Sequence, residues 1–288
     1  MPPPAIELSV LIPAYNEEES IRETVQALLA MAPQFKALQV IVINDGSADG
    51  TGKIARALPV EVIEHESNLG YGAALKSGMQ QAIYEYVLIA DADGTYPLED
   101  VSRLIEHIQE NDMVVAARTG KIVHVPPLRR PFKWIITRLA EYLINRKIPD
   151  LNSGFRIFRR DIALRFRALY PDGFSFTTTI TLAMMTNNYR VKYVPINYHK
   201  RIGKSSIRPL RDFMNFIILI IRICACFKPL NVFVPPALVL FLVGAIKASI
   251  DYLGQGHLGL FGIITILTGI QLLFIGLLAD LIDQRLKL

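Results

Sequence analysis

The sequence is poor in residues that form covalent cross-links. Only two of its 288 residues are cysteines, Cys224 and Cys226. They are one residue apart, which is unfavourable for a disulfide between them, and no further cysteine could complete a metal site. We therefore interpret both as small apolar side chains in a reducing compartment.

The N-terminal residues also lack the pattern of a cleavable signal peptide. Met1–Glu7 contains three prolines and no basic residue, and no long apolar run follows. We therefore expect the N-terminal part of the chain to stay in the cytoplasm. Internal repeats and low-complexity linkers are also absent.

Apolar residues make up 51% of the chain, and the mean hydropathy is +0.32, which is high for a soluble enzyme. The excess lies at the C-terminus. Val232–Leu253 and Leu258–Ala279 are each long enough to span a bilayer, with a loop of a few residues between them. The sequence therefore predicts a hairpin of two transmembrane helices.

Lysine and arginine flank this hairpin unequally. Arg222 and Lys228 precede it, and Arg285 and Lys287 follow it, whereas the connecting loop contains neither residue type. The bias predicts that both ends face the cytoplasm and that only the loop near Gln255 lies outside.

Two basic segments precede the hairpin and are amphipathic. Pro131–Arg146 has apolar residues along one face, and Arg208–Lys228 carries a narrow polar stripe on an otherwise apolar helix. Such helices commonly pack on the core of their own domain. Basic charge can also mean nucleic acid, but the position next to transmembrane segments favours helices at the membrane surface.

The first half of the chain alternates between apolar, strand-like runs and helical patterns. Such alternation predicts an α/β fold with a mainly parallel sheet covered by helices on both faces. Ligands of such folds bind beyond the carboxyl ends of the strands. The predicted strands are Leu8–Pro13, Val40–Ile43, Val60–His65, Tyr86–Ala90 and Met113–Ala117, and the predicted helices are Ser20–Met31, Thr51–Leu58, Ala73–Tyr84 and Pro97–Gln109.

Polar motifs follow three of these strands: Ile12–Glu17, Asn44–Thr51 and Asp91–Asp93. Each alone could be a turn or a helix cap. Together they converge on one edge of the sheet, where Asp91 and Asp93 could share Mg²⁺ or Mn²⁺ with two phosphate oxygens. Other polar groups there could bind a base and ribose.

A glycine-rich segment, Asn68–Gly78, lies between the second and third motifs. Its glycines would let the backbone approach a ligand, and Lys76 lies on the helix that follows. The Gly-Lys-Ser/Thr ending of a Walker-type phosphate loop is missing.

These motifs resemble those of family 2 glycosyltransferases with the GT-A fold, and within them dolichol-phosphate mannose synthase and bacterial polyprenyl-phosphate glycosyltransferases. The resemblance covers about residues 6–210. The shared motifs are Pro13-Ala-Tyr-Asn-Glu17, Asp45-Gly-Ser-x-Asp-Gly-Thr51, Asn68-x-Gly-x-Gly, Asp91-x-Asp93, Ser153-Gly-Phe-Arg156 and Arg201-x-Gly-Lys-Ser205.

The resemblance implies roles for these residues. It implies that Pro13, Tyr15, Glu17 and Asp45 contact the nucleoside. It also implies that Asp91 and Asp93 bind the metal and the diphosphate. Many members have Asp-Asp-Gly-Ser where this chain has Asn44-Asp45. Some bacterial relatives have Gly-Asp-Phe-Arg where this chain has Ser153–Arg156, a form typical of the mannose-phosphate synthases.

Basic residues complete the expected site. The acceptor phosphate is assigned to Arg118, Arg129, Arg130 and Ser153, and the donor nucleotide also to Lys76, Arg201 and Lys204. Arginine suits phosphate because its guanidinium is planar and permanently charged. Contact with anionic lipid is the alternative for several of them. The catalytic set is Asp91, Asp93, Arg118 and Arg156.

The sequence therefore predicts inverting, metal-dependent transfer of a hexose from a GDP- or UDP-sugar to polyprenyl or dolichyl phosphate. Residues 1–207 would form the catalytic domain, with a first interfacial helix at 129–147. Residues 208–228 would form the second interfacial helix, and 229–288 the transmembrane pair. No nucleic acid is expected, and homo-oligomer formation stays open.

Two alternatives remain. A processive polysaccharide synthase would need a Gln-x-x-Arg-Trp motif, but Phe-Lys precedes the only tryptophan, Trp134. A non-catalytic scaffold that binds nucleotide sugars is disfavoured by the intact Asp45, Asp91, Asp93 and Arg156.

Overall fold

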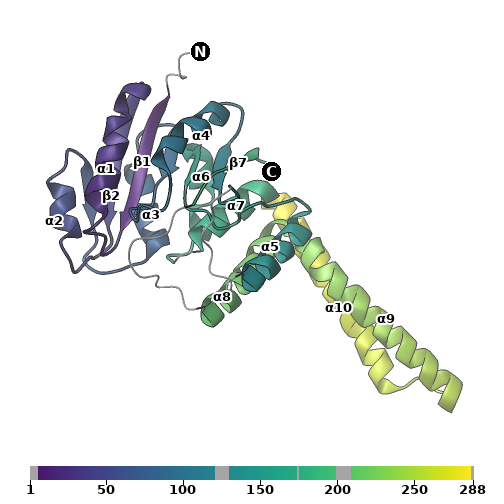
Figure 1. Cartoon of the computed structure of the whole chain (residues 1–288). Coiled ribbons are helices and arrows are strands. Elements are labelled where there is room, and N and C mark those ends of the chain that lie inside the picture. The colour runs from purple at the N-terminus through teal and green to yellow at the C-terminus, as the bar shows by residue number, and fades with distance from the viewer. Residues whose placement is uncertain (1–5, 121–129, 174, 199–208, 287–288) are drawn as a thin grey trace.

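The structure is a computed structural model that describes residues 6–120, 130–173, 175–198 and 209–286. It combines an α/β domain with a long helical hairpin that projects away from it (Figure 1). The central sheet has seven strands in the order β3-β2-β1-β4-β6-β5-β7. The strands are β1 (Glu7–Ala14), β2 (Ala37–Asn44), β3 (Glu61–Glu64), β4 (Tyr86–Ile89), β5 (Met113–Ala117), β6 (Arg156–Arg159) and β7 (Val191–Pro195).

The sheet is parallel except at β6, so the predicted mainly parallel sheet is confirmed. β1 pairs in parallel with β2 and β4, and β5 pairs in parallel with β7. β6 lies antiparallel between β4 and β5. Because of this reversal, β6 begins at the same edge of the sheet where its two neighbours end.

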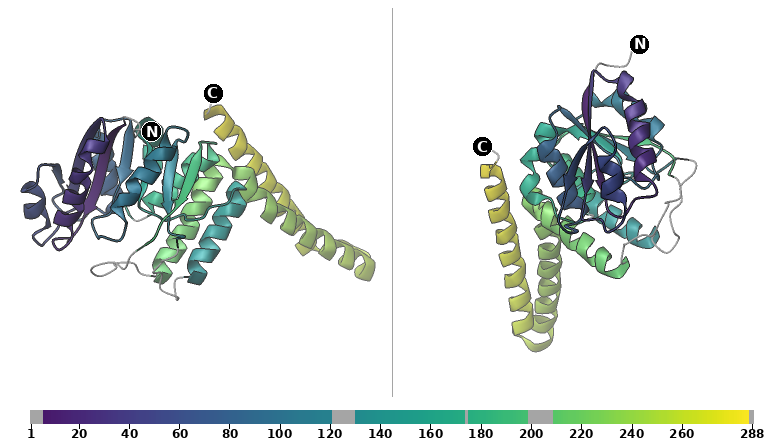
Figure 2. Two further views of the ribbon diagram at one scale, coloured as in Figure 1. Left: turned by 45° about the horizontal axis from the view of Figure 1, so that its top comes forward. Right: turned by 90° about the vertical axis from the view of Figure 1, so that its left-hand side faces the viewer.

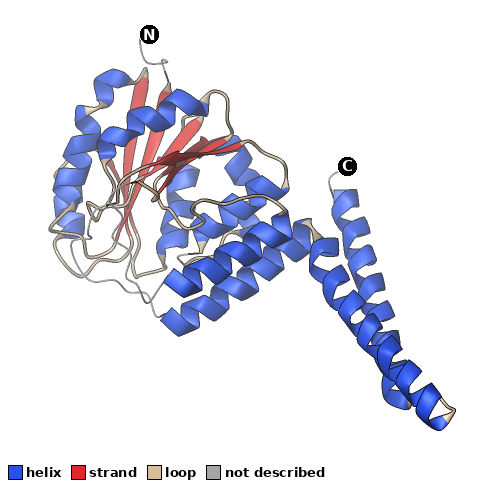
Figure 3. Cartoon of the chain, turned by 45° about the vertical axis from the view of Figure 1, so that its right-hand side comes forward, coloured by secondary structure: helices blue, strands red, loops and turns tan. Residues whose placement is uncertain are grey.

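Helices cover both faces of the sheet (Figure 3). Alternate residues of β1 point to opposite faces, so that Val10 packs with α1 and α4 and Leu11 packs with α3. α6 and α7 share the second face. The helices of this domain are α1 (Ile21–Ala30), α2 (Thr51–Arg56), α3 (Tyr71–Gln81), α4 (Val101–Ile108), α6 (Arg160–Arg165) and α7 (Phe176–Thr186), with short 3₁₀ turns at Ala32–Gln34, Leu98–Asp100 and Arg167–Leu169.

The two amphipathic segments form α5 (Arg130–Ile144) and α8 (Pro209–Phe227), which lie side by side (Figure 2). Ile136 and Leu143 of α5 and Ile223 of α8 are buried together against Leu182 of α7. Part of each apolar face therefore packs on the domain itself. α5 also leaves Trp134 and Tyr142 more than 60% exposed.

The C-terminal hairpin consists of α9 (Pro229–Gln255) and α10 (Leu260–Leu286). Both are long and apolar enough to cross a membrane, with mean hydropathies of 2.1 and 2.3 over the spans. Glycine permits close contact between them, since a Cβ at Gly244 would lie 2.8 Å from the backbone nitrogen of Ile266 and one at Gly269 would lie 2.9 Å from the carbonyl oxygen of Ala237. The predicted pair of long apolar helices is therefore confirmed.

Candidate active site

The loops after β1 and β2 are hydrogen-bonded to each other. The backbone N–H of Asn16 donates to Ser47 Oγ at 3.0 Å, and Asn16 Oδ1 accepts from the N–H of Ala48 at 2.9 Å. Asn16 has a left-handed backbone, with φ of 56°. These contacts hold Tyr15 at the carboxyl end of β1, directly after Pro13 and Ala14. The Tyr15 side chain is 48% exposed.

Asp45, directly after β2, is buried among hydrogen-bond donors. Its Oδ1 contacts His65 Nδ1 at 2.7 Å and accepts from the N–H of Leu69 at 3.0 Å, and its Oδ2 accepts from the N–H of Gly70 at 2.8 Å. His65 Nε2 lies 2.9 Å from Ser77 Oγ. Asp45 therefore fixes the backbone that leads from β3 to α3.

Asp91 and Asp93 follow β4, and each carboxylate is held in place by a hydroxyl. Tyr71 Oη donates to Asp91 Oδ1 at 2.9 Å. Burial, and then the charge of Asp91, hold the pKa of Tyr71 well above its ordinary value, so the phenol keeps its proton. Asp93 Oδ1 accepts from the N–H of Thr95 at 3.2 Å and from Thr95 Oγ1 at 2.6 Å.

The surroundings of this acidic pair suit a divalent cation. A Cβ at Gly154 would lie 2.6 Å from Asp91 Oδ2, so only glycine leaves room beside that oxygen. Within the described residues, no group of three or more His, Cys, Asp or Glu is placed to hold a metal. Two carboxylates fit Mg²⁺ or Mn²⁺, which are commonly held by one or two carboxylates together with substrate phosphates.

The glycine-rich segment approaches another part of the chain. The N–H groups of Gly72 and Ala73 donate to the carbonyl oxygen of Asp172 at 2.7 and 3.0 Å. A Cβ at Gly72 would lie 2.1 Å from the carbonyl oxygen of Pro171. Lys76 forms an ion pair with Asp172. The glycine backbone was expected to approach a ligand, but in the structure it approaches residues 171–173. The role of Lys76 in nucleotide binding stays a prediction.

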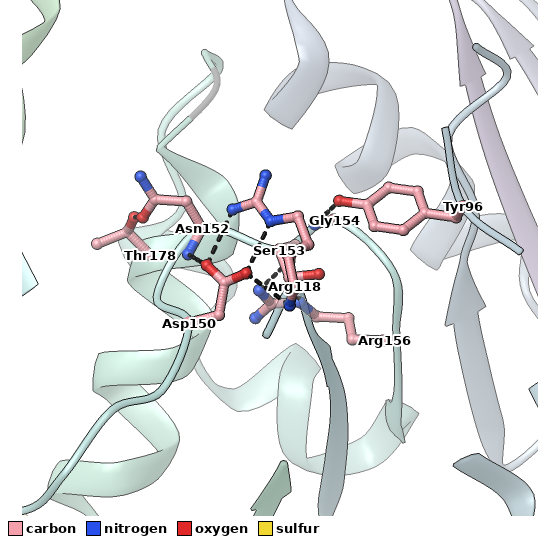
Figure 4. Close-up of polar contacts among 8 residues, drawn as sticks. All are labelled: Tyr96, Arg118, Asp150, Asn152, Ser153, Gly154, Arg156 and Thr178. Atoms are coloured by element: carbon pink, nitrogen blue, oxygen red, sulfur yellow. Dashed lines mark hydrogen bonds and ion pairs between the residues drawn. The ribbon is translucent and has the colours of Figure 1, made fainter. Parts of the chain in front are cut away.

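Arg118, directly after β5, forms a two-bond ion pair with Asp150 (Figure 4). Nε donates to Asp150 Oδ2 at 2.7 Å, Nη2 donates to Oδ1 at 2.9 Å, and the N–H of Arg118 donates to Oδ2 at 3.0 Å. The Tyr198 ring lies 5.2 Å from the guanidinium carbon. Burial disfavours the charged guanidinium, but the charge and hydrogen bonds of Asp150, together with the nearby Tyr96 and Tyr198, outweigh it and hold the pKa of Arg118 well above its ordinary value.

Arg156 lies beneath the loop that precedes β6 and is completely buried. Its guanidinium donates to the carbonyl oxygen of Ser153, to that of Thr177 at 3.0 Å and to Thr181 Oγ1 at 2.8 Å. Burial lowers the pKa of Arg156 from its ordinary value. In this position Arg156 supports the shape of the loop, and its catalytic role stays a prediction.

The same loop is also tied to the segment that follows β4. The N–H of Gly154 donates to Tyr96 Oη at 2.9 Å, and the Tyr96 ring stacks on Phe155 with centroids 5.3 Å apart. Sequence reasoning missed Asp150, Tyr71 and Tyr96. Asp150 stands three residues before the Ser153–Arg156 motif, and that position was the only signal for it.

The described residues therefore place Tyr15, Asp45, Asp91, Arg118 and Ser153 at one edge of the sheet. Arg129, Arg201 and Lys204 lie outside the described residues. Arg130 begins α5, but its side chain is not among those described.

Comparison with known families gives two matches. Residues 9–166 match the family described as "Glycosyl transferase family 2", and residues 228–284 match the "GtrB C-terminal hairpin". The second match covers α9 and α10 almost completely.

Two curated relatives act on polyprenyl phosphates according to their names. A dolichyl-phosphate hexose transferase of Haloferax volcanii is 30% identical over 220 residues, which cover 76% of this chain and 94% of the relative. An undecaprenyl-phosphate mannosyltransferase of Micrococcus luteus is 28% identical over 211 residues, which cover 68% of this chain and 86% of the relative.

The fold also resembles that of solved structures. Glucosyl-3-phosphoglycerate synthase from Mycobacterium tuberculosis, in complex with Mn²⁺, UDP and phosphoglyceric acid, aligns with a TM-score of 0.60 and 18% identity. The alignment covers 76% of this chain and 78% of the solved chain. The predicted GT-A fold is confirmed.

Proposed function

Because the chain belongs to glycosyl transferase family 2, we propose that it transfers a hexose from a GDP- or UDP-sugar to a polyprenyl phosphate at a membrane surface. The relatives named above support the lipid phosphate as acceptor. The apolar hairpin supports a reaction beside the membrane, since it would anchor the domain there.

One observation carries the proposal: the loop before β6 lies between an acidic pair and a fixed arginine. β6 pairs with β4 on one side and with β5 on the other. Gly154 therefore faces Asp91 at the end of β4, while Asp150 holds Arg118 at the end of β5. Carboxylates suit a metal-bound donor diphosphate, and a guanidinium suits a phosphate acceptor.

The donor nucleotide would occupy the β1 and β2 side of this edge. Tyr15, with Pro13 and Glu17, would line the nucleoside, and Asp45 would shape the pocket by holding the backbone of Leu69 and Gly70. Basic side chains would attract the diphosphate. This set comprises Lys76, Arg201 and Lys204.

The acceptor phosphate would bind on the β5 side. Arg118 and Ser153 would contact it, together with Arg129 and with Arg130, the first residue of α5. A phosphate monoester is already largely ionised near neutral pH, so its oxygen needs no strong base before it attacks.

The reaction would be a single displacement. A lipid phosphate oxygen forms a bond to the anomeric carbon as the bond from that carbon to the nucleoside diphosphate breaks, with its electron pair leaving on the diphosphate. The anomeric configuration is inverted. Asp91 and Asp93 would hold Mg²⁺ or Mn²⁺, and the chemistry that the bound cation would supply is neutralisation of the charge on the diphosphate.

We further propose that the catalytic domain and the C-terminal tail face the cytoplasm. Lysine and arginine flank the hairpin before α9 and at the end of α10, and the connecting loop contains neither. Single cysteines at Gly254 and Arg285 in a Cys224→Ala/Cys226→Ala background test this orientation. Gly254→Cys should react with a membrane-impermeant maleimide in intact cells, and Arg285→Cys only after permeabilisation. Labelling of Arg285→Cys from outside would contradict the topology.

The proposed reaction is tested with the purified full chain in lipid bilayers. UDP- and GDP-sugars are each combined with undecaprenyl or dolichyl phosphate and a divalent cation, and the glycolipid is identified by mass spectrometry. Transfer of one hexose to the lipid phosphate supports the proposal. Binding of nucleotide sugar without transfer would instead indicate a scaffold, and growing polysaccharide would indicate a processive synthase.

A further inference from the structure

Asp150 is a buried carboxylate to which neither the family match nor the motifs assign a role. It lies in the loop between α5 and β6, and its side chain is fully inaccessible to solvent. We propose that Asp150 is a positioning residue, which holds the Arg118 guanidinium in the orientation that binds the acceptor phosphate. This inference rests on the proposed function.

The contacts leave Arg118 little rotational freedom. Asp150 accepts from Nε and Nη2, which fixes the plane of the guanidinium, and from the N–H of Arg118, which fixes the backbone at the end of β5. The third nitrogen, Nη1, points away from Asp150 (Figure 4). An anion that meets Nη1 would find a donor already oriented, so less side-chain entropy is lost on binding.

Other contacts hold the carboxylate itself in place. The N–H of Asn152 donates to Asp150 Oδ1 at 3.4 Å, and Asn152 Oδ1 accepts from Thr178 Oγ1 of α7 at 2.8 Å. The Tyr198 ring lies beside the guanidinium. Arg118 is therefore connected to the same loop that carries Ser153, the other side chain expected at the acceptor phosphate.

A role limited to stability is the competing explanation. Buried ion pairs often stabilise a fold no better than apolar side chains of similar volume, because both charges lose their hydration. A pair kept only for stability could lie anywhere in the core, whereas this one joins the end of β5 to the loop that carries Ser153 and Gly154 (Figure 4). A positioning role predicts that loss of Asp150 changes the KM for the acceptor but not the Kd for the donor nucleotide. A role limited to stability does not predict this separation.

The test compares the full-length wild type with Asp150→Asn, Arg118→Gln and the double variant. In detergent, with saturating nucleotide sugar and Mn²⁺, the KM for farnesyl phosphate is measured, and the Kd for the nucleoside diphosphate is obtained by calorimetry. Asp150→Asn should raise the KM about tenfold, since it replaces an acceptor beside Nη2 or Nε with a donor, and should leave the Kd unchanged. In the Arg118→Gln background it should change the KM less than about twofold.

Asp112→Asn is the matched control, because Asp112 lies at the opposite end of β5, where it accepts from the N–H of Arg190 at 2.7 Å. It should leave both constants unchanged. If Asp150→Asn does not fold, Asp150→Glu replaces it, since this variant keeps the charge beside Arg118 but displaces it by one methylene. It should also raise the KM.

Three outcomes would overturn the positioning role. The first is an unchanged acceptor KM in the folded Asp150→Asn variant, and the second is a loss of donor affinity as large as the change in KM. The third is a double variant whose change in KM is the sum, in free energy, of the changes in the two single variants. Failure of the wild type to transfer to any prenyl phosphate would refute the proposed function and the inference with it. Transfer by the wild type with an unchanged KM in the variants would refute the inference alone.

Discussion

Two turns of the protein have the same sequence, Asp-Gly-Thr, and the same hydrogen bonds. After β2, Asp49 Oδ1 accepts from the N–H of Thr51 at 3.0 Å and from its Oγ1 at 2.5 Å. After β4, Asp93 Oδ1 accepts from the N–H of Thr95 at 3.2 Å and from its Oγ1 at 2.6 Å. Each aspartate therefore accepts the same pair of hydrogen bonds from the threonine two residues later.

Their surroundings differ. Asp49 is partly exposed at the start of α2, where it also accepts from the N–H of Glu18 at 3.2 Å. Asp93 is buried and stands two residues after Asp91, which faces Tyr71 and Gly154. The motif therefore specifies a turn, and the neighbouring strands and loops decide whether that turn can take part in chemistry.

The largest effect should separate these two turns. Asp93→Asn keeps an oxygen that can accept both bonds from Thr95, but it removes a charge that a divalent cation needs. Turnover should fall about a hundredfold or more, since the cation supplies several kcal/mol of charge stabilisation. The measurements are the initial rate of glycolipid formation and Mn²⁺ affinity by electron paramagnetic resonance.

Asp49→Asn makes the same chemical change in the other turn and should stay within about twofold of the wild type. Excess chelator should abolish wild-type turnover. Equal losses in the two variants, or full activity in chelator, would show that the β4 turn is not the metal site.

A smaller effect is expected from Tyr71→Phe, which removes the hydroxyl that orients Asp91. Removal of a hydrogen-bond partner of a metal-binding carboxylate typically weakens metal affinity by about tenfold or more. Mn²⁺ binding should therefore weaken about tenfold, with little change in melting temperature. Tyr170→Phe is the matched control, because Tyr170 Oη donates to the carbonyl oxygen of Ala163 at 2.8 Å, far from the acidic pair in sequence. Weakening of similar size in the control would mean that Tyr71 acts only through stability.

The smallest effect should come from the β2 side. Asp45→Asn places an amide N–H against a donor, the N–H of Gly70 or Leu69, and should disturb the backbone that borders the proposed nucleoside site. We expect about fivefold weaker nucleoside diphosphate binding, or about 1 kcal/mol, because Asp45 would act on the nucleotide only through the backbone that it holds. Acceptor KM and Mn²⁺ affinity should stay unchanged. A change confined to the acceptor KM would contradict the proposal that Asp45 lies on the donor side of the site.

The parallel part of the fold was predictable because its signals are local. The five predicted strands match β1 to β5 with boundary shifts of three residues or fewer. The hairpin helices were also predicted, although α9 begins three residues earlier, at Pro229, and α10 continues seven residues beyond Ala279. Apolar runs and helical periodicity need no knowledge of distant contacts.

The chain between α5 and α8 was less predictable. β6 is four residues long and has arginine at both ends, so its sequence has no apolar run that distinguishes it from a loop. β7 and α7 were also missed; α7 is buried throughout although it contains five threonines, which conceal its buried character. The positions of these elements depend on pairing with strands formed elsewhere in the chain.

The sequence by itself determined which residue types follow each parallel strand, because strand direction alone brings Tyr15, Asp45, Asp91 and Arg118 to one edge. Only the tertiary structure decided how those side chains are used. Asp45 and Arg118 are engaged by His65 and Asp150, which are 20 and 32 residues away in the chain. Hydrogen bonds of this kind depend on direction and on distances near 3 Å, and such geometry arises only when the sheet has assembled.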